Sequence, residues 1–454
     1  MKRALAAQQL RLSVAAHNIA NSATEGYSRQ RVIIRARQGT VLPNSLRWTG
    51  GGVEAAEVQR QRDTFMDALV RFELGRTAEW EVLSTGWQRL ESIMQEPAGK
   101  GISEYLTAFW DTWRQLATLP ESSASRTALR EQAKSLVAVF QELDGQLVAY
   151  REELAGRVDA LVTEINSLAS RVAVLNRDIT RAQAAGRSTA DLADRRDLLV
   201  DRLSTAVGAQ VNVLEDGTLQ VMVGRQALVD GTRVHRLESV PQADGGRLVI
   251  WEETGDQVSG GGQLAGLLAL AETHVAALRT RLSRLAETLY SKVNELHRQG
   301  YDLYGNQGGD FFTLKGGSGF TLNALQVNPA FDQEVALMAA ALDPGQPGDG
   351  RNALAIAALS REPVIDGVTL NEFHRQTLAE LGVSTATARQ LHENQQLIIT
   401  DLQRQREAVS GVNLDEEIVT LVEAQHAYAA AARVVEVMDR MLATLIDELG
   451  LAGR

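Results

Sequence analysis

Residues 136–179 read LVAVFQELDGQLVAYREELAGRVDALVTEINSLASRVAVLNRDI, a repeat of large apolar residues that sets the architecture. These residues recur at alternating steps of four and three, with one extra step of four between Leu154 and Val158. A 4,3 spacing places side chains along one stripe of an α-helix, and an inserted step of four changes the supercoil locally without ending the helix. The stretch therefore predicts one long helix with a continuous apolar face.

A second repeat of the same kind runs from Leu264 to Leu296. Two helices of this length predict an antiparallel pair or a bundle. Helical periodicity also resumes from about Gln59, with interruptions at 97–101 and Pro120, and it returns from about Leu370. With only 8 prolines in 454 residues, the chain contains few helix breakers. We predict a mainly α fold whose core domain is a long-helix bundle built from residues 41–206 and 263–409.

Residues 207–262 have a different pattern. Apolar residues alternate on both sides of Asp216-Gly217 and of Asp230-Gly231. Asp-Gly between alternating apolar residues is the strongest short-range hairpin signal. This segment predicts a small β-rich domain inserted between the two long helices. A lone hairpin is also predicted at 364–368 around Asp366-Gly367.

The spacing at both ends of the chain predicts amphipathic helices with a single apolar stripe: a helix and turn in residues 1–40, and a second helix in residues 410–454. Asn18 and Asn21 are expected to cap the first helix, and Gly26-Tyr27 to turn the chain into an extended segment. Asn413, followed by three acidic residues, is a predicted N-cap that suits the helix dipole.

The charges of the two ends favour their pairing. Residues 1–37 hold seven Lys or Arg against one Glu, a net charge of +6, whereas residues 411–454 hold three Arg against eight acidic residues, a net charge of −5. Opposite charge on two seamed helices predicts that the N-terminal helix docks on the C-terminal one. Two other interpretations stay open: the ends could merely cap the bundle, or the basic N-terminal helix could lie on a membrane surface.

The composition offers little for catalysis. The chain has no cysteine, so thiolate nucleophiles and thiolate metal sites are excluded, and its net charge of −11 argues against a broad nucleic-acid surface. No two of the seven histidines have metal-ligand spacing, although a site assembled from distant His and Asp stays open. Gly316–Gly319 lacks a P-loop pattern, and the segment around Asp302, Asn306 and Asp310 fits a solvated turn better than a calcium loop. We expect no catalytic residue, no cofactor, no metal, no nucleic acid and no membrane insertion.

Several short motifs carry a resemblance to a known family. The segments QQL at 8–10, HNIAN at 17–21 and TEGYSRQ at 24–30 are similar to the N-terminal signature of flagellar rod, hook and hook-associated axial proteins. SGVNLDEE at 410–417, with DLADRRDLL at 191–199 and GYDLYGN at 300–306, resembles the flagellar hook-associated protein 1 (FlgK) family. The motif residues at the two ends are Asn18, Asn21, Gly26, Tyr27, Ser28, Arg29, Gln30, Ser410, Gly411, Val412, Asn413, Leu414, Asp415 and Glu416.

The resemblance implies a structural protein without enzymatic activity that joins the flagellar hook to the filament by helical self-assembly through its terminal helices. It implies these partners: other copies of the chain, the hook protein, the next hook-associated (filament-junction) protein, and an export chaperone at the C-terminal helix. It also implies an extracellular location at the hook–filament junction, reached through the flagellar type III apparatus without a cleaved signal. The expected assembly interface comprises Leu5, Leu12, Ile19, Leu414, Ile418, Leu421, Tyr428, Val435, Leu442 and Ile446.

Alternatives remain at this point. A hook or filament-junction type of axial protein would share the N-terminal motif, and a non-flagellar coiled-coil surface scaffold would share the helical seams. Only seven residues precede Gln8, where relatives usually carry another turn or two of helix, so a truncated start is one expectation. The β-insertion is small, and no outer-surface contact is inferred for it.

Overall fold

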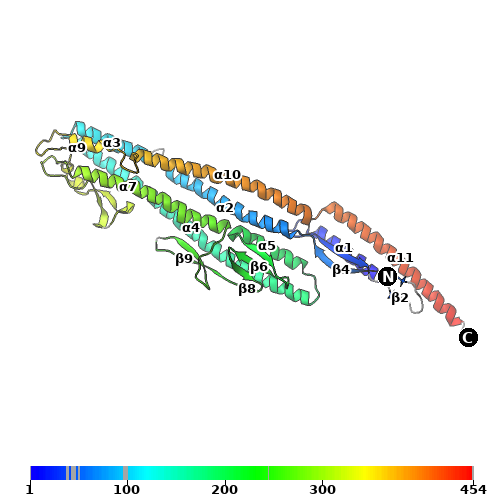
Figure 1. Ribbon diagram of the computed structural model, residues 1–454. Helices are drawn as coiled ribbons and strands as arrows, with labels where there is room; N and C mark the ends of the chain where they lie inside the picture. Colours follow the sequence, from blue (N-terminus) through cyan, green and yellow to red (C-terminus); the bar gives the residue numbers. More distant parts are fainter. Residues whose placement is uncertain are drawn as a thin grey trace.

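The computed structural model describes residues 2–36, 40–41, 48–49, 52–95, 101–243, 245–317 and 319–451. The molecule is an elongated rod of long helices, and both termini lie toward the same end of it (Figure 1). The helices are α1 (Lys2–Asn21), α2 (Thr64–Gln95), α3 (Ile102–Thr118), α4 (Ser123–Ala184), α5 (Ala190–Val207), α6 (Gly262–Leu268), α7 (Ala276–His297), α8 (Ala330–Gln333), α9 (Arg351–Ala358), α10 (Leu370–Ser410) and α11 (Leu414–Leu451).

The strands are short and lie in small antiparallel sheets. They are β1 (Gln30–Ala36), β2 (Thr40–Val41), β3 (Trp48–Thr49), β4 (Val53–Arg60), β5 (Gln210–Val213), β6 (Leu219–Val223), β7 (Gln226–Asp230), β8 (Arg233–Val234), β9 (Leu237–Pro241), β10 (Arg247–Trp251), β11 (Phe312–Leu314) and β12 (Leu325–Val327). One sheet has the order β5-β6-β7-β8, and the pairs β1-β4, β2-β3, β9-β10 and β11-β12 form two-stranded sheets. The mainly α fold predicted from the repeats is confirmed.

The body of the rod is built around α4. This helix has 62 residues, which corresponds to roughly 90 Å at a rise of 1.5 Å per residue. Leu136, Phe140, Leu147 and Leu154 of the predicted seam are fully buried in the main core. The inserted step of four leaves the helix unbroken, as expected. Helices α2, α7 and α10 run along α4 in the same body (Figure 1).

The second predicted seam forms α6 and α7, with a π-helical segment at Ala269–Val275 between them. Between α5 and α6 lie β5 to β10, in the range where Asp-Gly turns predict strands. The insert is held to α4 by Asn176, whose Nδ2 donates to the carbonyl oxygens of Leu219 and Gly231 at 2.8 and 2.6 Å. The lone hairpin is confirmed as well, with Ile365 bridging Val368 across the turn.

One prediction about the N-terminal half is wrong. Helical periodicity was expected from about Gln59, but Gln59 and Arg60 belong to β4, where they pair with Arg31 and Gln30 of β1. The helix α2 begins only at Thr64, after Asp63, whose Oδ1 accepts the backbone N–H groups of the first turn. Hydrogen bonds to a distant strand thus override the local pattern. The predicted interruption at 97–101 falls mostly outside the described residues, and Pro120 lies between α3 and α4 as expected.

Candidate assembly site: the terminal helices and their joint

The two ends of the chain form a layer of their own at one end of the rod. Helix α1 lies beside α11, and the β1-β4 hairpin lies next to α1 (Figure 1). We call α1, α11 and this hairpin the terminal layer, and α2 to α10 the body. As the opposite charges predict, Arg11 of α1 faces Glu423 of α11 with 3.8 Å between the charged atoms. The ends therefore do more than cap the bundle, because the terminal layer projects beyond it.

Asn18 links three segments of the terminal layer. Its Nδ2 donates to the Gln30 carbonyl oxygen at 2.9 Å and to Glu417 Oε2 at 3.0 Å. Its Oδ1 accepts the Gln30 backbone N–H at 3.0 Å and the Tyr27 hydroxyl at 2.7 Å. The expectation that Asn18 caps α1 is wrong, because all these bonds lead to other segments. Asn21 does cap the helix, donating to the His17 carbonyl oxygen at 2.9 Å.

Arg29 joins the N-terminal motif to the C-terminal one. Its backbone N–H donates to the Ser410 carbonyl oxygen at 2.9 Å. Its guanidinium donates from Nε to Glu417 Oε1 at 2.6 Å and from Nη1 to Glu416 Oε2 at 2.7 Å. The Glu417 side chain is only 3% exposed, whereas that of Glu416 is 59% exposed. Glu417, expected as part of the 410–417 motif and as an acidic residue near the helix dipole, is thus a central acceptor that the predicted site residues left out.

The hydroxyl of Tyr27 remains a donor throughout the physiological range. Burial first, and then the negative charges of nearby carboxylates, raises the pKa of Tyr27 well above its usual value. The protonated hydroxyl therefore keeps its hydrogen bond to Asn18.

A third motif, residues 191–199 of α5, completes the contact with the body. Ser28 donates from its backbone N and its hydroxyl to the two oxygens of Asp194, at 3.1 and 2.7 Å. Gln30 Nε2 donates to Asp191 Oδ1 at 2.9 Å. We call the contacts among residues 18–30, 191–201 and 410–417 the joint. The 191–199 motif, identified in the sequence only as a family marker, thus receives a structural role.

Arg60 at the end of β4 and Arg62 in the connection to α2 reinforce the joint, and neither was predicted from the sequence. Arg60 Nη1 donates to Asp194 at 2.9 Å and to Asp197 at 2.7 Å, and Arg62 Nη1 donates to Asp197 at 3.1 Å. Burial by itself raises the pKa of the Asp197 carboxyl, but the surrounding guanidinium groups outweigh that effect and hold the pKa below its usual value. Asp197 is therefore a buried carboxylate that pairs with arginines from β4 and from the connection that follows it.

Two glycines of the motifs are required by backbone geometry. Gly26 has φ = 77°, a left-handed conformation, and a Cβ there would lie 3.3 Å from the Leu198 Cβ. At Gly411 a Cβ would lie within 2.4 Å of the Glu407 carbonyl oxygen, where α10 ends. Asn413 then caps α11 as predicted, since its Oδ1 accepts the backbone N–H of Asp415 at 3.0 Å. Val412 lies half-buried in the same connection.

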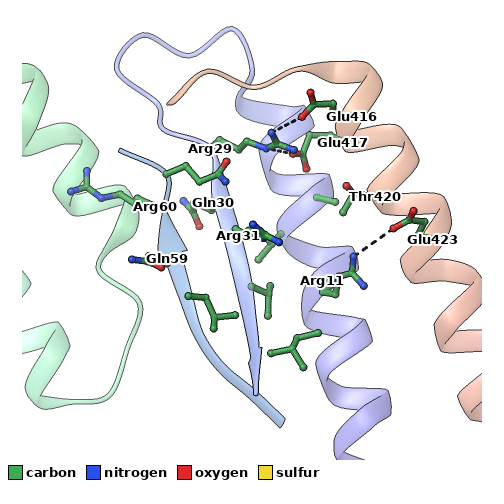
Figure 2. A pocket seen from close by; sticks show the side chains of 16 residues that line it. Arg11, Arg29, Gln30, Arg31, Gln59, Arg60, Glu416, Glu417, Thr420 and Glu423 are labelled. Carbon is green, nitrogen blue, oxygen red and sulfur yellow. Dashed lines mark hydrogen bonds and ion pairs between the residues drawn. The ribbon is translucent and has the colours of Figure 1, made fainter. Parts of the chain in front are cut away.

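A groove runs between the hairpin and the two terminal helices. It has a volume of about 840 Å³ and is lined by Arg11, Arg29, Arg31, Glu416, Glu417 and Glu423 among others. Figure 2 shows Arg29 reaching the two glutamates at the start of α11, and Arg11 reaching Glu423 farther along. Both signs of charge line it, and its carboxylates are engaged by arginines, so it serves to join segments.

The predicted interface residues differ in exposure. In α1 the buried positions are Ala7, Val14, Ala15 and Asn18, whereas Leu5, Leu12 and Ile19 are half-buried. In α11 the buried residues among those described are Glu417 and Ala424. The remaining predicted residues of α11 divide into Leu421 and Val435, which are half-buried, and Leu414, Ile418, Tyr428, Leu442 and Ile446, which are exposed.

Within the described ranges, no group of three or more His, Asp or Glu is arranged to hold a metal ion. Asp302 instead closes a turn, accepting the backbone N–H groups of Tyr304 and Asn306, both at 2.8 Å. Of the helices whose residues are described, none is both long and apolar enough to cross a membrane.

Comparison with known proteins gives a consistent result along the chain. Residues 87–312 match the family model of the flagellar hook-associated protein FlgK helical domain. The flagellar hook-associated protein 1 of Bacillus subtilis is 27% identical over 497 aligned residues, covering 100% of this chain and 98% of that protein. The protein of the same name from Salmonella typhimurium is 26% identical, with 98% of each chain covered. The chain belongs to the flagellar hook-associated protein 1 (FlgK) family.

The ends of this hook-associated chain match models of other axial proteins. Residues 2–27 match the flagella basal body rod protein, and residues 403–448 match the C-terminal region of the flagellar basal body rod FlgEFG proteins. The structure described as the flagellar hook junction protein FlgK from Burkholderia pseudomallei shares the fold. Its TM-score is 0.68 at 16% identity, and the match covers 76% of this chain and 100% of that one.

Proposed function

We propose that this chain is a structural component of the flagellum that joins hook to filament, and that its copies assemble helically through α1 and α11. Its family supports the junction role, and the relative from Burkholderia pseudomallei is described as a flagellar hook junction protein. The models matched by both ends are those of rod proteins, which are also parts of the flagellar axis. In this proposal the protein has a mechanical role, and the surfaces of α1 and α11 determine which proteins it binds.

The apolar outer face of α11 is the single observation that carries the assembly proposal. Large apolar residues are exposed along nearly the whole helix, where a soluble helix normally shows polar ones. They are Leu414, Ile418, Val419, Val422, Tyr428, Val434, Val437, Met438, Met441, Leu442, Leu445 and Ile446. Full burial of a large apolar side chain is worth about 1.5–3 kcal/mol, and covering the exposed part of each of these side chains stabilises an assembly by a fraction of that. Neighbouring copies supply that cover.

Helix α1 has a complementary position in this scheme. Its small residues Ala7 and Ala15 are buried, which lets α1 pack closely in its own copy. Leu5, Leu12 and Ile19 are half-buried, so part of each side chain is left for a neighbour. Because the contacting patches differ, the contact is heterologous and repeats along a helical polymer instead of closing a dimer.

Assembly with other flagellar axial proteins follows from the family, and the finer partners are part of the proposal. The hook protein and the next hook-associated protein are expected to contact the terminal layer at its two ends. An export chaperone is expected to cover α11 before assembly, because an exposed apolar helix promotes aggregation. We propose an extracellular location at the junction, reached by type III export without a cleaved signal.

A different axial protein of the hook or filament-junction type is the second candidate. The rod-protein models at the two ends favour an axial protein of any type. The FlgK helical-domain model, which matches most of the body, favours the hook-associated assignment. A non-flagellar scaffold has no comparable support.

The double substitution Leu442→Asp/Ile446→Asp tests the assembly proposal. Both side chains are exposed, at 53% and 68%, so the single copy is expected to fold normally. Cells carrying the variant are expected to make hooks without filaments and to shed filament protein into the medium, as seen by electron microscopy and immunoblotting. The control Val383→Asp, at an equally exposed site (67%) on α10, is expected to leave filaments attached. Attached filaments in the double variant would show that α11 is not the assembly surface.

A further inference from the structure

We propose that the first turns of α11 in one copy dock into an arginine-rimmed groove between α4 and α5 of a neighbouring copy. The inference rests on the proposed function and adds a specific contact to it. The groove has a volume of about 470 Å³. Its floor is apolar, with Val174 and Leu175 from α4 and Leu198 and Leu199 from α5.

The rim of this groove carries positive charge that the copy itself does not neutralise. Arg171, Arg195 and Arg202 line it. In the described part of the chain, neither Arg171 nor Arg195 pairs with a carboxylate, and Arg202 comes only within 3.9 Å of Glu25. An apolar floor with a cationic rim fits an apolar segment that carries acidic groups.

The start of α11 has that composition on its outer face. Ile418, Val419 and Val422 are exposed there, between 42% and 58%. Asp415 lies three residues before Ile418, so the two share a face of the helix. The Asp415 side chain is exposed and makes no ion pair with another described residue. The inner face of the same turns is occupied, because Glu417 bonds to Arg29 and Asn18.

The two surfaces lie at the same level of the rod but cannot meet within one copy. The groove borders the joint, since Leu198 lies against Gly26. The start of α11 belongs to the joint as well, through the bond between Arg29 and Ser410. In one copy the groove is open while the outer face of α11 is exposed, so the contact forms between copies. Groove and helix are different patches, which gives the heterologous contact that a helical assembly needs.

The absence of cysteine makes a clean crosslinking test possible. One variant, Val174→Cys, and a second, Val422→Cys, are expressed together in cells lacking the native chain, and flagella are isolated and oxidised. A disulfide forms only where Cα atoms come within about 7 Å. Because the two variants mix at random, about half of the grooves that carry Cys meet a helix that carries Cys, so we expect up to about half of the chain to run at twice its mass on non-reducing gels. The control pair Val383→Cys with Val422→Cys is expected to give less than a tenth of that yield.

Charge reversal provides a second readout. Arg171→Glu/Arg195→Glu in the Val174→Cys chain is expected to reduce the crosslink yield at least tenfold, and Asp415→Arg in the Val422→Cys chain to restore part of it. A yield equal to the control, or a Val174→Cys crosslink to a different flagellar protein, overturns the inference. If that happens while filaments stay attached to hooks, the junction role stands and the groove contact alone is wrong. Filaments attached in cells lacking the chain altogether would instead refute the junction role.

Discussion

Glu417→Ala is the most direct test of the joint. The carboxylate accepts Arg29 Nε at 2.6 Å and Asn18 Nδ2 at 3.0 Å, and its side chain is 3% exposed. Hydrogen bonds to charged groups contribute about 1.5–3 kcal/mol each. The lower end applies here, because Arg29 keeps Glu416 and Asn18 keeps the Gln30 carbonyl after the change. Removing both bonds should cost about 3 kcal/mol, a roughly 150-fold increase in the opening of α11 from α1.

Amide hydrogen exchange measured by mass spectrometry on the single copy follows this opening. Peptides covering residues 414–430 are expected to lose protection, and peptides from the centre of α4 to keep it. The matched control is Glu423→Ala on the same helix. Its side chain is 66% exposed and 3.8 Å from Arg11, so the change should cost less than about 0.5 kcal/mol.

The predicted loss of protection is confined to the start of α11. Equal loss of protection in Glu417→Ala and Glu423→Ala would refute it, as would a loss spread evenly over α4. A double-mutant cycle with Arg29→Ala isolates the pair. The two changes are expected to be non-additive by at least about 1 kcal/mol, because they remove the same bond.

Two further predictions concern pH and backbone geometry. Burial lowers the pKa of His297 and of His374 to about 4, so between pH 6.5 and 4 the unfolded chain binds protons that the folded chain does not. The free energy of unfolding should therefore decrease as the pH drops through that window, by on the order of 3 kcal/mol per histidine. A urea midpoint unchanged between pH 7 and pH 4.5 would contradict this. Gly26→Ala places a side chain at φ = 77° against Leu198 and should cost about 1–2 kcal/mol, measured as faster exchange in residues 22–30. Gly156→Ala, at a helical position with open space around it, should cost nothing or stabilise, and equal behaviour of the two variants would argue against backbone strain.

The parts of the fold that could be predicted depend on local spacing. The repeat from Leu136 onward fixes one face of α4, and Asp-Gly pairs between alternating residues fix the turns of the insert. The partner of β1 could not be found in this way. Val53–Arg60 reads VEAAEVQR, which has neither a run of large apolar residues nor clear alternation, and its hydrogen bonds alone make it a strand.

In the candidate site, too, the features set by local sequence could be predicted and those set by long-range contacts could not. Motifs at 18–30 and 410–417 could be recognised, yet the role of Asn18 was misjudged because helix-end rules consider only neighbours in sequence. Arg60 and Asp197 are 137 residues apart, and no periodicity relates two such positions. Leu5 and Leu12 were predicted to form the contact face of α1 because they are large and apolar. The buried face is instead formed by small residues such as Ala7.

The uninterrupted length of α4 has a mechanical consequence. A helix that continues through 62 residues, supported by its neighbours, resists bending and twisting over most of the rod. At the crossing between the two layers the chain passes through the short segments 61–63 and 411–413, braced by the ion pairs of Asp194 and Asp197. A twisting load on the subunit is therefore expected to concentrate strain at that crossing. The stiffness of this crossing depends on how many arginine–carboxylate bonds stretch together. Substitution of a single charged residue there is therefore enough to change it.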